Sequence, residues 1–240
     1  MANVLSFALG YLTKLDSPNS KNLLTYLNKL GISGIELTFA TKERLYSFKL
    51  TKYLKRRFKK LKYISIHAPF DLIKKSKDEK EIIKQLDVIA SLYSEVKAQN
   101  VIIHPDDLPS PEILRKYNFK VSTENLRKKR KFSISKLNKI FKKYPQLGFC
   151  LDTSHAYSWS ENETNRLCRI FKDRITQVHL SARIKEKDHQ LLINADKKFL
   201  SSIIPISKLD APIVIEETFK KIDFKSVKKE IKFIKTFFKK

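Results

Sequence analysis

Eight short segments rich in β-branched and aromatic residues recur along the chain with little polar alternation. In chain order they are Val4–Gly10, Gly34–Ala40, Tyr63–Pro69, Asn100–Pro105, Phe119–Leu126, Leu147–Ala156, Ile175–Ala182 and Pro212–Phe219. Unbroken apolar character is typical of parallel strands covered on both faces, because such strands leave neither face to water. The pattern therefore predicts eight buried parallel strands.

Lysine-rich segments with helical periodicity separate these strands. They cover Asn22–Leu30, Lys42–Leu61, Lys80–Ala98, Ser133–Tyr144, Glu163–Asp173 and Phe224–Phe238. In the second of them, Leu45, Phe48, Leu54 and Phe58 recur at the spacing that places apolar side chains on one helix face. The stretch Lys187–Leu209 is longer and less regular, so we expect much of it to be a functional loop.

Strands that alternate with helices predict βαβ units and a parallel sheet. Eight such units favour an α/β fold closed as a (β/α)8, or TIM, barrel over a doubly wound sheet, and barrels of this kind take about 250 residues. The chain has 240 residues. It contains no linker or low-complexity tract, so we predict one TIM-barrel domain over residues 1–240.

The two cysteines, Cys150 and Cys168, form no spacing motif and predict no disulfide framework. We therefore expect a reducing, cytoplasmic location. The apolar stretch Val4–Leu12 has no basic leader and no small-residue cleavage site, so it predicts a strand and not a signal peptide. No apolar run is long enough to span a bilayer, so we expect no membrane partner.

The charge changes the picture of possible partners. Lysine and arginine total 50 against 25 aspartate and glutamate, which gives a net charge of +25. Such an excess favours polyanions, DNA or RNA first. Lysine on the exposed faces of amphipathic helices would give the same net charge without a nucleic-acid partner. Net charge indicates non-specific binding and gives no information on the chemistry of a site. Charge alone leaves both interpretations open.

All five histidines fall at or just beyond the carboxyl end of a predicted strand. Four occur in the strings SIHAP, VIIHP, CLDTSHA and QVHLS, and the fifth follows the seventh strand: His67, His104, His155, His179 and His189. Three carboxylates occupy matching places: Glu124, Asp152 and Glu216. The carboxyl ends of barrel strands form one rim, so these side chains should converge. Imidazole and carboxylate ligands suit Zn²⁺, Mn²⁺ or Fe²⁺, which predicts a divalent-metal site.

Strand parity separates inward from outward side chains, because residues two apart share a face. Glu217 shares a face with Ile215, which should pack on the outer helices. We therefore predict that Glu216 points inward, with Glu217 as the alternative if a bulge shifts the strand. Cys150 shares a face with Asp152, so we expect a residue of the barrel interior and not a nucleophile.

Taken in order, these strings resemble the superfamily that joins endonuclease IV, the abasic-site DNA nuclease, with the xylose isomerase-like sugar isomerases and epimerases. The string CLDTSHA around Asp152 and His155 is the most specific piece, followed by HAP at His67 and HP at His104. The resemblance covers nearly the whole chain and implies a metal-dependent enzyme on a TIM barrel.

The nuclease branch of this superfamily binds three zinc ions and hydrolyses phosphodiester bonds at abasic or damaged sites in DNA. Positions that match its metal ligands are His67, His104, Glu124, Asp152, His155, His179, His189 and Glu216. Its pattern also has an aspartate two residues before the last histidine. Here that place is Lys187, and Asp188 is adjacent instead. The resemblance to this branch makes zinc the expected ion, with Mn²⁺ as the alternative.

A basic run follows Glu124 directly, near the predicted mouth of the barrel. We predict that four of its residues contact phosphates of a nucleic acid: Arg127, Lys128, Lys129 and Arg130. The alternative is the solvated start of a helix, which the run by itself does not exclude.

In the isomerase branch a single metal, often Mn²⁺, is held by residues that match Glu124, Asp152, His179 and Glu216. The substrate would be a sugar or sugar phosphate, and Glu124 and Glu216 would act catalytically as general base and acid. A third interpretation is a barrel that binds metal or nucleic acid without turnover, since glycines of the nuclease loops are missing. The full histidine set, the CLDTSHA string and the net charge favour the nuclease, with DNA as partner.

Overall fold

The computed structural model describes residues 4–12, 27–73, 78–128, 132–219 and 224–239. Within these residues, each of the eight predicted segments contains one strand of a parallel sheet. The strands are β1 (Leu5–Ala8), β2 (Gly34–Thr38), β3 (Tyr63–His67), β4 (Asn100–Ile102), β5 (Val121–Glu124), β6 (Gly148–Asp152), β7 (Ile175–Leu180) and β10 (Ile213–Ile215).

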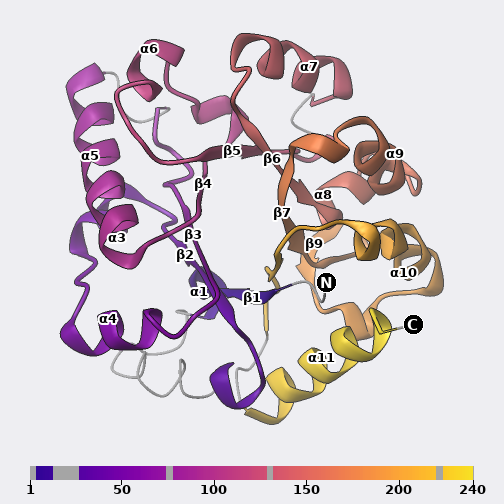
Figure 1. Ribbon diagram of the computed structural model, residues 1–240. Coiled ribbons are helices and arrows are strands. Elements are labelled where there is room, and N and C mark those ends of the chain that lie inside the picture. The colour runs from indigo at the N-terminus through magenta and orange to yellow at the C-terminus, as the bar shows by residue number, and fades with distance from the viewer. Residues whose placement is uncertain (1–3, 13–26, 74–77, 129–131, 220–223, 240) are drawn as a thin grey trace.

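The sheet closes on itself in the order β1-β10-β7-β6-β5-β4-β3-β2. Figure 1 shows the described helices arranged around the ring of strands. The first strand, β1, pairs with β10, the last strand of the ring. The predicted single TIM barrel is therefore confirmed as a fold. The register aligns Glu36 with Ser65, and Asp152 with His179, so that side chains from neighbouring strands meet at one level of the barrel.

The helices lie mostly where periodicity places them. They are α1 (Leu9–Leu12), α3 (Lys42–Ser47), α4 (Lys52–Phe58), α5 (Glu79–Val96), α6 (Pro111–Leu114), α7 (Ile134–Lys143), α8 (Thr153–Tyr157), α9 (Glu163–Ile170), α10 (Lys197–Ile203) and α11 (Phe224–Phe237). Most of the helix expected at 22–30 lies outside the described residues. None of the described helices combines the length and apolar character that crossing a bilayer requires.

The prediction of one continuous helix over Lys42–Leu61 is wrong in detail. The chain turns extended at Phe48, and α4 begins after Thr51, whose side chain accepts a hydrogen bond from the backbone nitrogen of Leu54 at 3.3 Å. A threonine that satisfies a free amide in this way is a strong helix start. The cap at Thr51 therefore starts a new helix, although the apolar residues continue at helical spacing.

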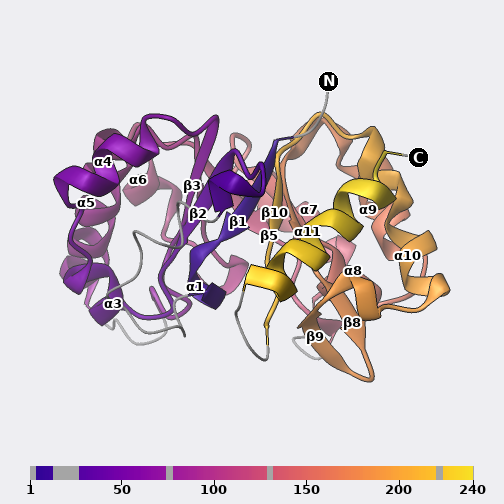
Figure 2. The same cartoon turned by 90° about the horizontal axis from the view of Figure 1, so that it is seen from below.

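The expectation that much of Lys187–Leu209 is a loop is also wrong. The segment holds α10, whose cap Asp196 accepts from the Phe199 nitrogen at 2.8 Å. It begins with β9 (Lys187–Gln190), which pairs antiparallel with β8 (Ala182–Ile184) in a hairpin. Figure 2 shows this hairpin at the same end of the barrel as α1, the helix that directly follows β1. The hairpin therefore stands at the carboxyl ends of the strands.

The buried residues lie in two different environments. The shell between strands and helices is apolar, with Ile64 and Ile66 of β3 packed among buried side chains of α5 such as Leu86 and Ile89. Fully burying one such side chain stabilises the fold by roughly 1.5–3 kcal/mol. The barrel interior is polar toward its carboxyl end, where Ser65 and its neighbours are buried. This polar interior forms the candidate site.

Candidate metal centre

The structure brings all eight predicted metal ligands to the carboxyl end of the barrel. His67 ends β3, His104 follows β4, Glu124 ends β5, Asp152 ends β6, His155 lies in α8, His179 lies in β7, His189 lies in β9 and Glu216 follows β10. His104 and His189 are half-buried and the others are buried. The closed ring of strands therefore makes one cluster from residues that are up to 149 positions apart, from 67 to 216.

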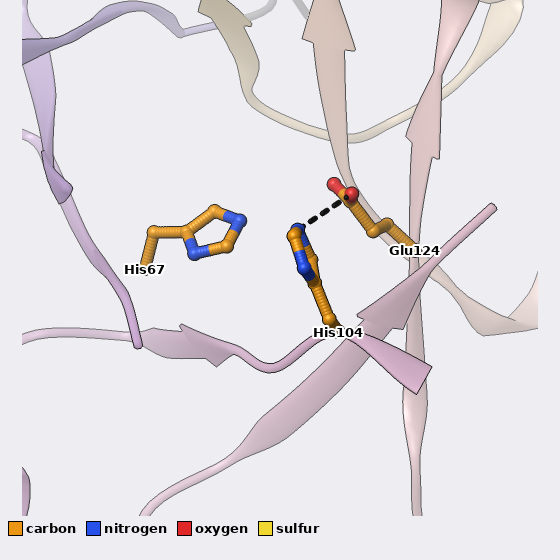
Figure 3. Close-up of side chains that lie close together, drawn as sticks. All are labelled: His67, His104 and Glu124. Carbon is orange, nitrogen blue, oxygen red and sulfur yellow. Dashed lines mark ion pairs between the residues drawn. The ribbon is translucent and has the colours of Figure 1, made fainter. Parts of the chain in front are cut away.

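One part of this cluster contains His67, His104 and Glu124, whose donor atoms lie within 4.8 Å of one another. Figure 3 shows both imidazole rings directed toward the carboxylate, with His104 Nε2 at 3.1 Å from Glu124 Oε1. The ring of Phe70 stacks on His104 with centroids 5.1 Å apart. This aromatic contact holds the half-buried histidine in place.

Further donor groups adjoin the first one and overlap with it. Glu124, Asp152 and His155 form one group, and Asp152, His189 and Glu216 form another, each with donor atoms within 4.8 Å. Glu124 and Asp152 each belong to more than one group. A carboxylate has two oxygens, so each of these two residues can contact neighbouring cations at once.

Three histidines are oriented by backbone carbonyls. Nδ1 lies near a carbonyl oxygen at 2.9 Å in His67, at 3.0 Å in His155 and at 3.2 Å in His189. A carbonyl oxygen only accepts, so in the neutral ring Nδ1 donates to it. Histidines that bind metals usually make such a hydrogen bond through one ring nitrogen, which fixes the orientation of the ring. In His155 and His189 the same Nδ1 also lies 3.6 Å from Asp152 Oδ2 and 3.8 Å from Glu216 Oε2, so the carbonyls orient these rings within the cluster.

Asp152 serves both as a helix cap and as a candidate ligand. Its Oδ1 accepts from the His155 backbone nitrogen at 2.6 Å and from Ser154 Oγ at 2.9 Å, at the start of α8. Asn125 hydrogen-bonds both the backbone nitrogen and the carbonyl of Asp152. The buried Oδ2 accepts no hydrogen bond from the described residues. An unsatisfied buried group costs about 1–3 kcal/mol, which a bound cation would offset, so the donors fit a metal.

His179 lies at the centre of the negative charge. Its Nδ1 is 3.2 Å from Glu124 Oε2 and 3.1 Å from Glu216 Oε2. Burial lowers the pKa of this imidazole, but neighbours that include Glu36 and Glu216 outweigh it and hold the pKa well above the ordinary value. Burial raises the pKa of Glu216, and His179 and His189 counter it, bringing the pKa to about 2. The carboxylates around His179 therefore favour its protonated form when no cation is bound.

We expect metal affinity to rise with pH as a consequence. In the metal-free protein the raised pKa keeps His179 protonated near neutral pH, and a cation must displace that proton to reach Nδ1. One displaced proton makes the affinity about tenfold higher per pH unit until the pH exceeds the His179 pKa. Zinc calorimetry in buffers of different ionisation enthalpy counts the released protons. A pH-independent affinity with no proton release would contradict this charge state.

The sequence interpretation missed Glu36 of β2. This side chain is fully buried in the barrel interior, 3.2 Å from His179 Nε2. Burial raises the pKa of Glu36, but His179 outweighs it and brings the pKa below its ordinary value. The available signal was a single charged residue within the apolar string GIELT. It was overlooked because Glu36 lies two residues before the end of its strand and not at the tip.

The choice between the adjacent glutamates follows strand parity. Glu216 points into the cluster, whereas Glu217 accepts from the Leu192 backbone nitrogen at 3.0 Å. Burial, followed by the neighbouring Glu230 of α11, raises the pKa of Glu217 well above its ordinary value. Glu217 is therefore a carboxyl group of the outer layer, and no bulge brings it to the rim.

Cys150 lies in the barrel interior with no exposed surface, as expected. Burial raises the pKa of its thiol to about 12. Its sulfur belongs to a donor group with Glu124 and His179. A neutral buried thiol is a poor nucleophile, because the thiolate is the reactive form.

Of the four predicted phosphate contacts, Arg127 and Lys128 belong to the described residues, and Arg127 contacts the hairpin. Arg127 is exposed, with Nη1 at 3.2 Å from Asp188 Oδ2, and Arg183 contacts the same carboxylate. Asp188 is thus engaged by arginines and belongs to none of the donor groups formed by the described residues. Lys128 is exposed, and its backbone nitrogen donates to Ser158 Oγ. Lys129 and Arg130 lie outside the described residues.

The class of this protein is that of TIM barrels that gather histidines and carboxylates at the carboxyl ends of their strands. A family model described as the xylose isomerase-like TIM barrel matches residues 24–237, and the chain belongs to that family. No curated protein matches the sequence.

Solved structures share the fold at low sequence identity. A D-tagatose 3-epimerase-like protein is 19% identical with a TM-score of 0.74, and the match covers 100% of this chain and 97% of the other. Endonuclease IV from Thermus thermophilus is 16% identical with a TM-score of 0.67 over 98% of each chain. Another Thermus thermophilus protein, solved after soaking with ZnCl2, is 18% identical with a TM-score of 0.64 over 96% of this chain and 98% of that one. These similarities show the shared fold alone.

Proposed function

We propose that this chain is a divalent-metal-dependent phosphodiesterase that cleaves DNA at abasic or damaged sites, with zinc as the expected ion. The observation that carries the proposal is the overlap of donor groups through Glu124 and Asp152. A one-metal isomerase needs only Glu124, Asp152, His179 and Glu216. It gives no ligand role to the pair His67 and His104, which face the same carboxylate.

In this proposal the residues divide among three adjoining positions. His67 and His104 would hold one ion with Glu124, and Glu124 would also serve a second position made by Asp152, His179 and Glu216. His155 and His189, which each form a donor group with Asp152, would hold the third. Divalent ions supply a lowered pKa for water and stabilisation of negative charge on phosphoryl oxygens. The burial of Glu124 and Asp152 excludes water from these contacts, which strengthens them.

The charge of the protein supports DNA as the substrate. The net charge is +25, and exposed Arg127 and Lys128 follow Glu124 at the mouth of the barrel. Phosphates of a duplex would compete with Asp188 for Arg127, since both are anions within reach of one guanidinium. Lys129 and Arg130 continue the same basic run and extend the proposed phosphate contacts.

A second candidate is a metal-dependent sugar or sugar-phosphate isomerase or epimerase. It is favoured by the similar distances of Glu124 and Glu216 from His179 Nδ1, at 3.2 and 3.1 Å. Two carboxylates beside one cation could serve as general base and acid on adjacent carbons of a sugar. The structural similarity to the D-tagatose 3-epimerase-like protein is in keeping with this candidate.

One pair of substitutions separates the two functions. The double variant His67→Ala/His104→Ala removes the position that only the nuclease needs and leaves the four isomerase-type ligands untouched. We expect the wild type to contain more than one zinc ion per chain and to incise an abasic-site duplex but not an intact one. The double variant should keep metal yet lose incision.

Lys60→Ala is the matched control, because this exposed lysine lies between α4 and β3, at the other end of the barrel. Its metal content and incision should equal those of the wild type. A wild type that holds one exchangeable Mn²⁺, leaves the abasic duplex intact and interconverts a ketose would reject the nuclease and support the second candidate.

A further inference from the structure

Glu36 makes contacts that set it apart from the other carboxylates of the barrel interior. Its Oε2 accepts from Ser65 Oγ at 2.9 Å and from Gln177 Nε2 at 2.7 Å, and it lies 3.2 Å from His179 Nε2. It belongs to none of the donor groups that could hold a cation among the described residues. Glu36 therefore contacts the candidate ligand His179 without belonging to a cation site itself.

His179 differs from the other oriented histidines because both of its ring nitrogens face carboxylates. His67, His155 and His189 direct Nδ1 at backbone carbonyls. His179 instead directs Nδ1 at Glu124 and Glu216 and turns Nε2 toward Glu36. A neutral imidazole carries one proton, so a proton on Nε2 is what leaves Nδ1 free as a ligand.

The surrounding hydrogen bonds show which groups near His179 Nε2 donate and which accept. The Tyr63 hydroxyl donates to Gln177 Oε1 at 2.6 Å, which turns the amide nitrogen of Gln177 toward Glu36 Oε2. Gln177 Nε2 also lies 2.8 Å from His179 Nε2, and an amide nitrogen donates. When Nδ1 binds a cation, the ring proton is on Nε2, and the Glu36 carboxylate is then the acceptor within reach. A carboxylate that accepts a hydrogen bond from one ring nitrogen of a histidine also raises the basicity of the other ring nitrogen, which faces the metal.

We propose that Glu36 is a positioning residue, which fixes the His179 proton on Nε2 so that Nδ1 binds the cation between Glu124 and Glu216. The inference rests on the metal site of the proposed function, and it holds for the nuclease and for the isomerase alike. The role of Glu36 is indirect, because its carboxylate contacts His179 and not the position of the cation.

Zinc titration of metal-stripped protein, followed by nitrogen-15 resonances of labelled histidine, tests this assignment at His179 itself. The wild type should show His179 bound through Nδ1 and protonated on Nε2. Glu36→Ala should weaken zinc binding at His179 by about 10–100-fold, the usual cost of losing a hydrogen-bond partner behind a metal ligand. Glu36→Gln keeps the size and an accepting oxygen but removes the charge, so its loss should be smaller.

Glu230→Gln is the matched control, because Glu230 is a fully buried glutamate on α11 whose carboxylate accepts from the Ile193 backbone nitrogen, outside the cluster. Its zinc affinity should equal that of the wild type, and circular dichroism confirms that each variant is folded. If Glu36→Ala does not fold, Glu36→Gln decides the question. The role of Glu36 is overturned if the Glu36 variants bind zinc with wild-type affinity, or if His179 is protonated on Nδ1 with zinc bound. The metal site itself would stand in both cases. A wild type that binds no zinc overturns the metal site as well.

Discussion

A Glu124→Gln variant is expected to bind fewer metal ions than the wild type and to lose most of its activity. Removing a residue that only hydrogen-bonds a metal ligand costs about 10–100-fold in activity, and we expect the loss of Glu124 to exceed this. Both oxygens of Glu124 are in use, with Oε1 facing His104 at 3.1 Å and Oε2 facing His179 at 3.2 Å. An amide supplies only one neutral acceptor and turns an NH2 group toward the second position. Metal per chain by mass spectrometry and the incision rate on an abasic duplex measure the effect.

The Glu230→Gln variant serves as the control for this substitution too, since it also replaces a buried glutamate by glutamine. It should retain both metal and activity. Glu230 lies on α11, and its carboxylate accepts from the Ile193 backbone nitrogen outside the cluster. Full metal content in Glu124→Gln would show that the donor groups around Glu124 do not hold the ions.

Zinc added to the metal-free protein is expected to raise the melting temperature by roughly 8–16 °C. An ion at about 1,000 times its dissociation constant stabilises the folded state by about 4.1 kcal/mol, if the unfolded chain does not bind it. For a chain of this size each kcal/mol shifts the melting temperature by about 2–4 °C. The effect should be large here because burial leaves the Asp152 Oδ2 without a hydrogen bond from the described residues. Differential scanning calorimetry measures the shift.

The same scan with Mg²⁺ separates this effect from general screening of charge. Mg²⁺ prefers oxygen ligands, so it should stabilise a histidine-rich site much less than zinc does. Glu124→Gln should show a smaller zinc shift than the wild type. A melting temperature that zinc leaves unchanged would mean that the buried carboxylates need no cation, and the metal site would have to be abandoned.

The sequence by itself predicted the strands, because burial on both faces leaves a pattern that does not depend on the neighbouring strand. All eight lie within the expected segments. It also predicted the side of each strand on which a residue lies, since alternation is a property of the extended backbone. Glu216 and Glu217 are a clear example, with the first in the cluster and the second against α11. Helix boundaries were less predictable, because single caps such as Thr51 decide them.

Only the tertiary structure decided which of these residues meet and with which atoms. The sequence indicates that His179 and Glu216 reach the same rim, but it does not show that the His179 ring meets Glu36, which belongs to a strand more than a hundred residues away. The β8–β9 hairpin and its contact between Asp188 and Arg127 also arise from packing. The physical reason is that backbone periodicity is local, whereas the geometry of a site is set by the closure and register of the barrel, which bring distant side chains to one level.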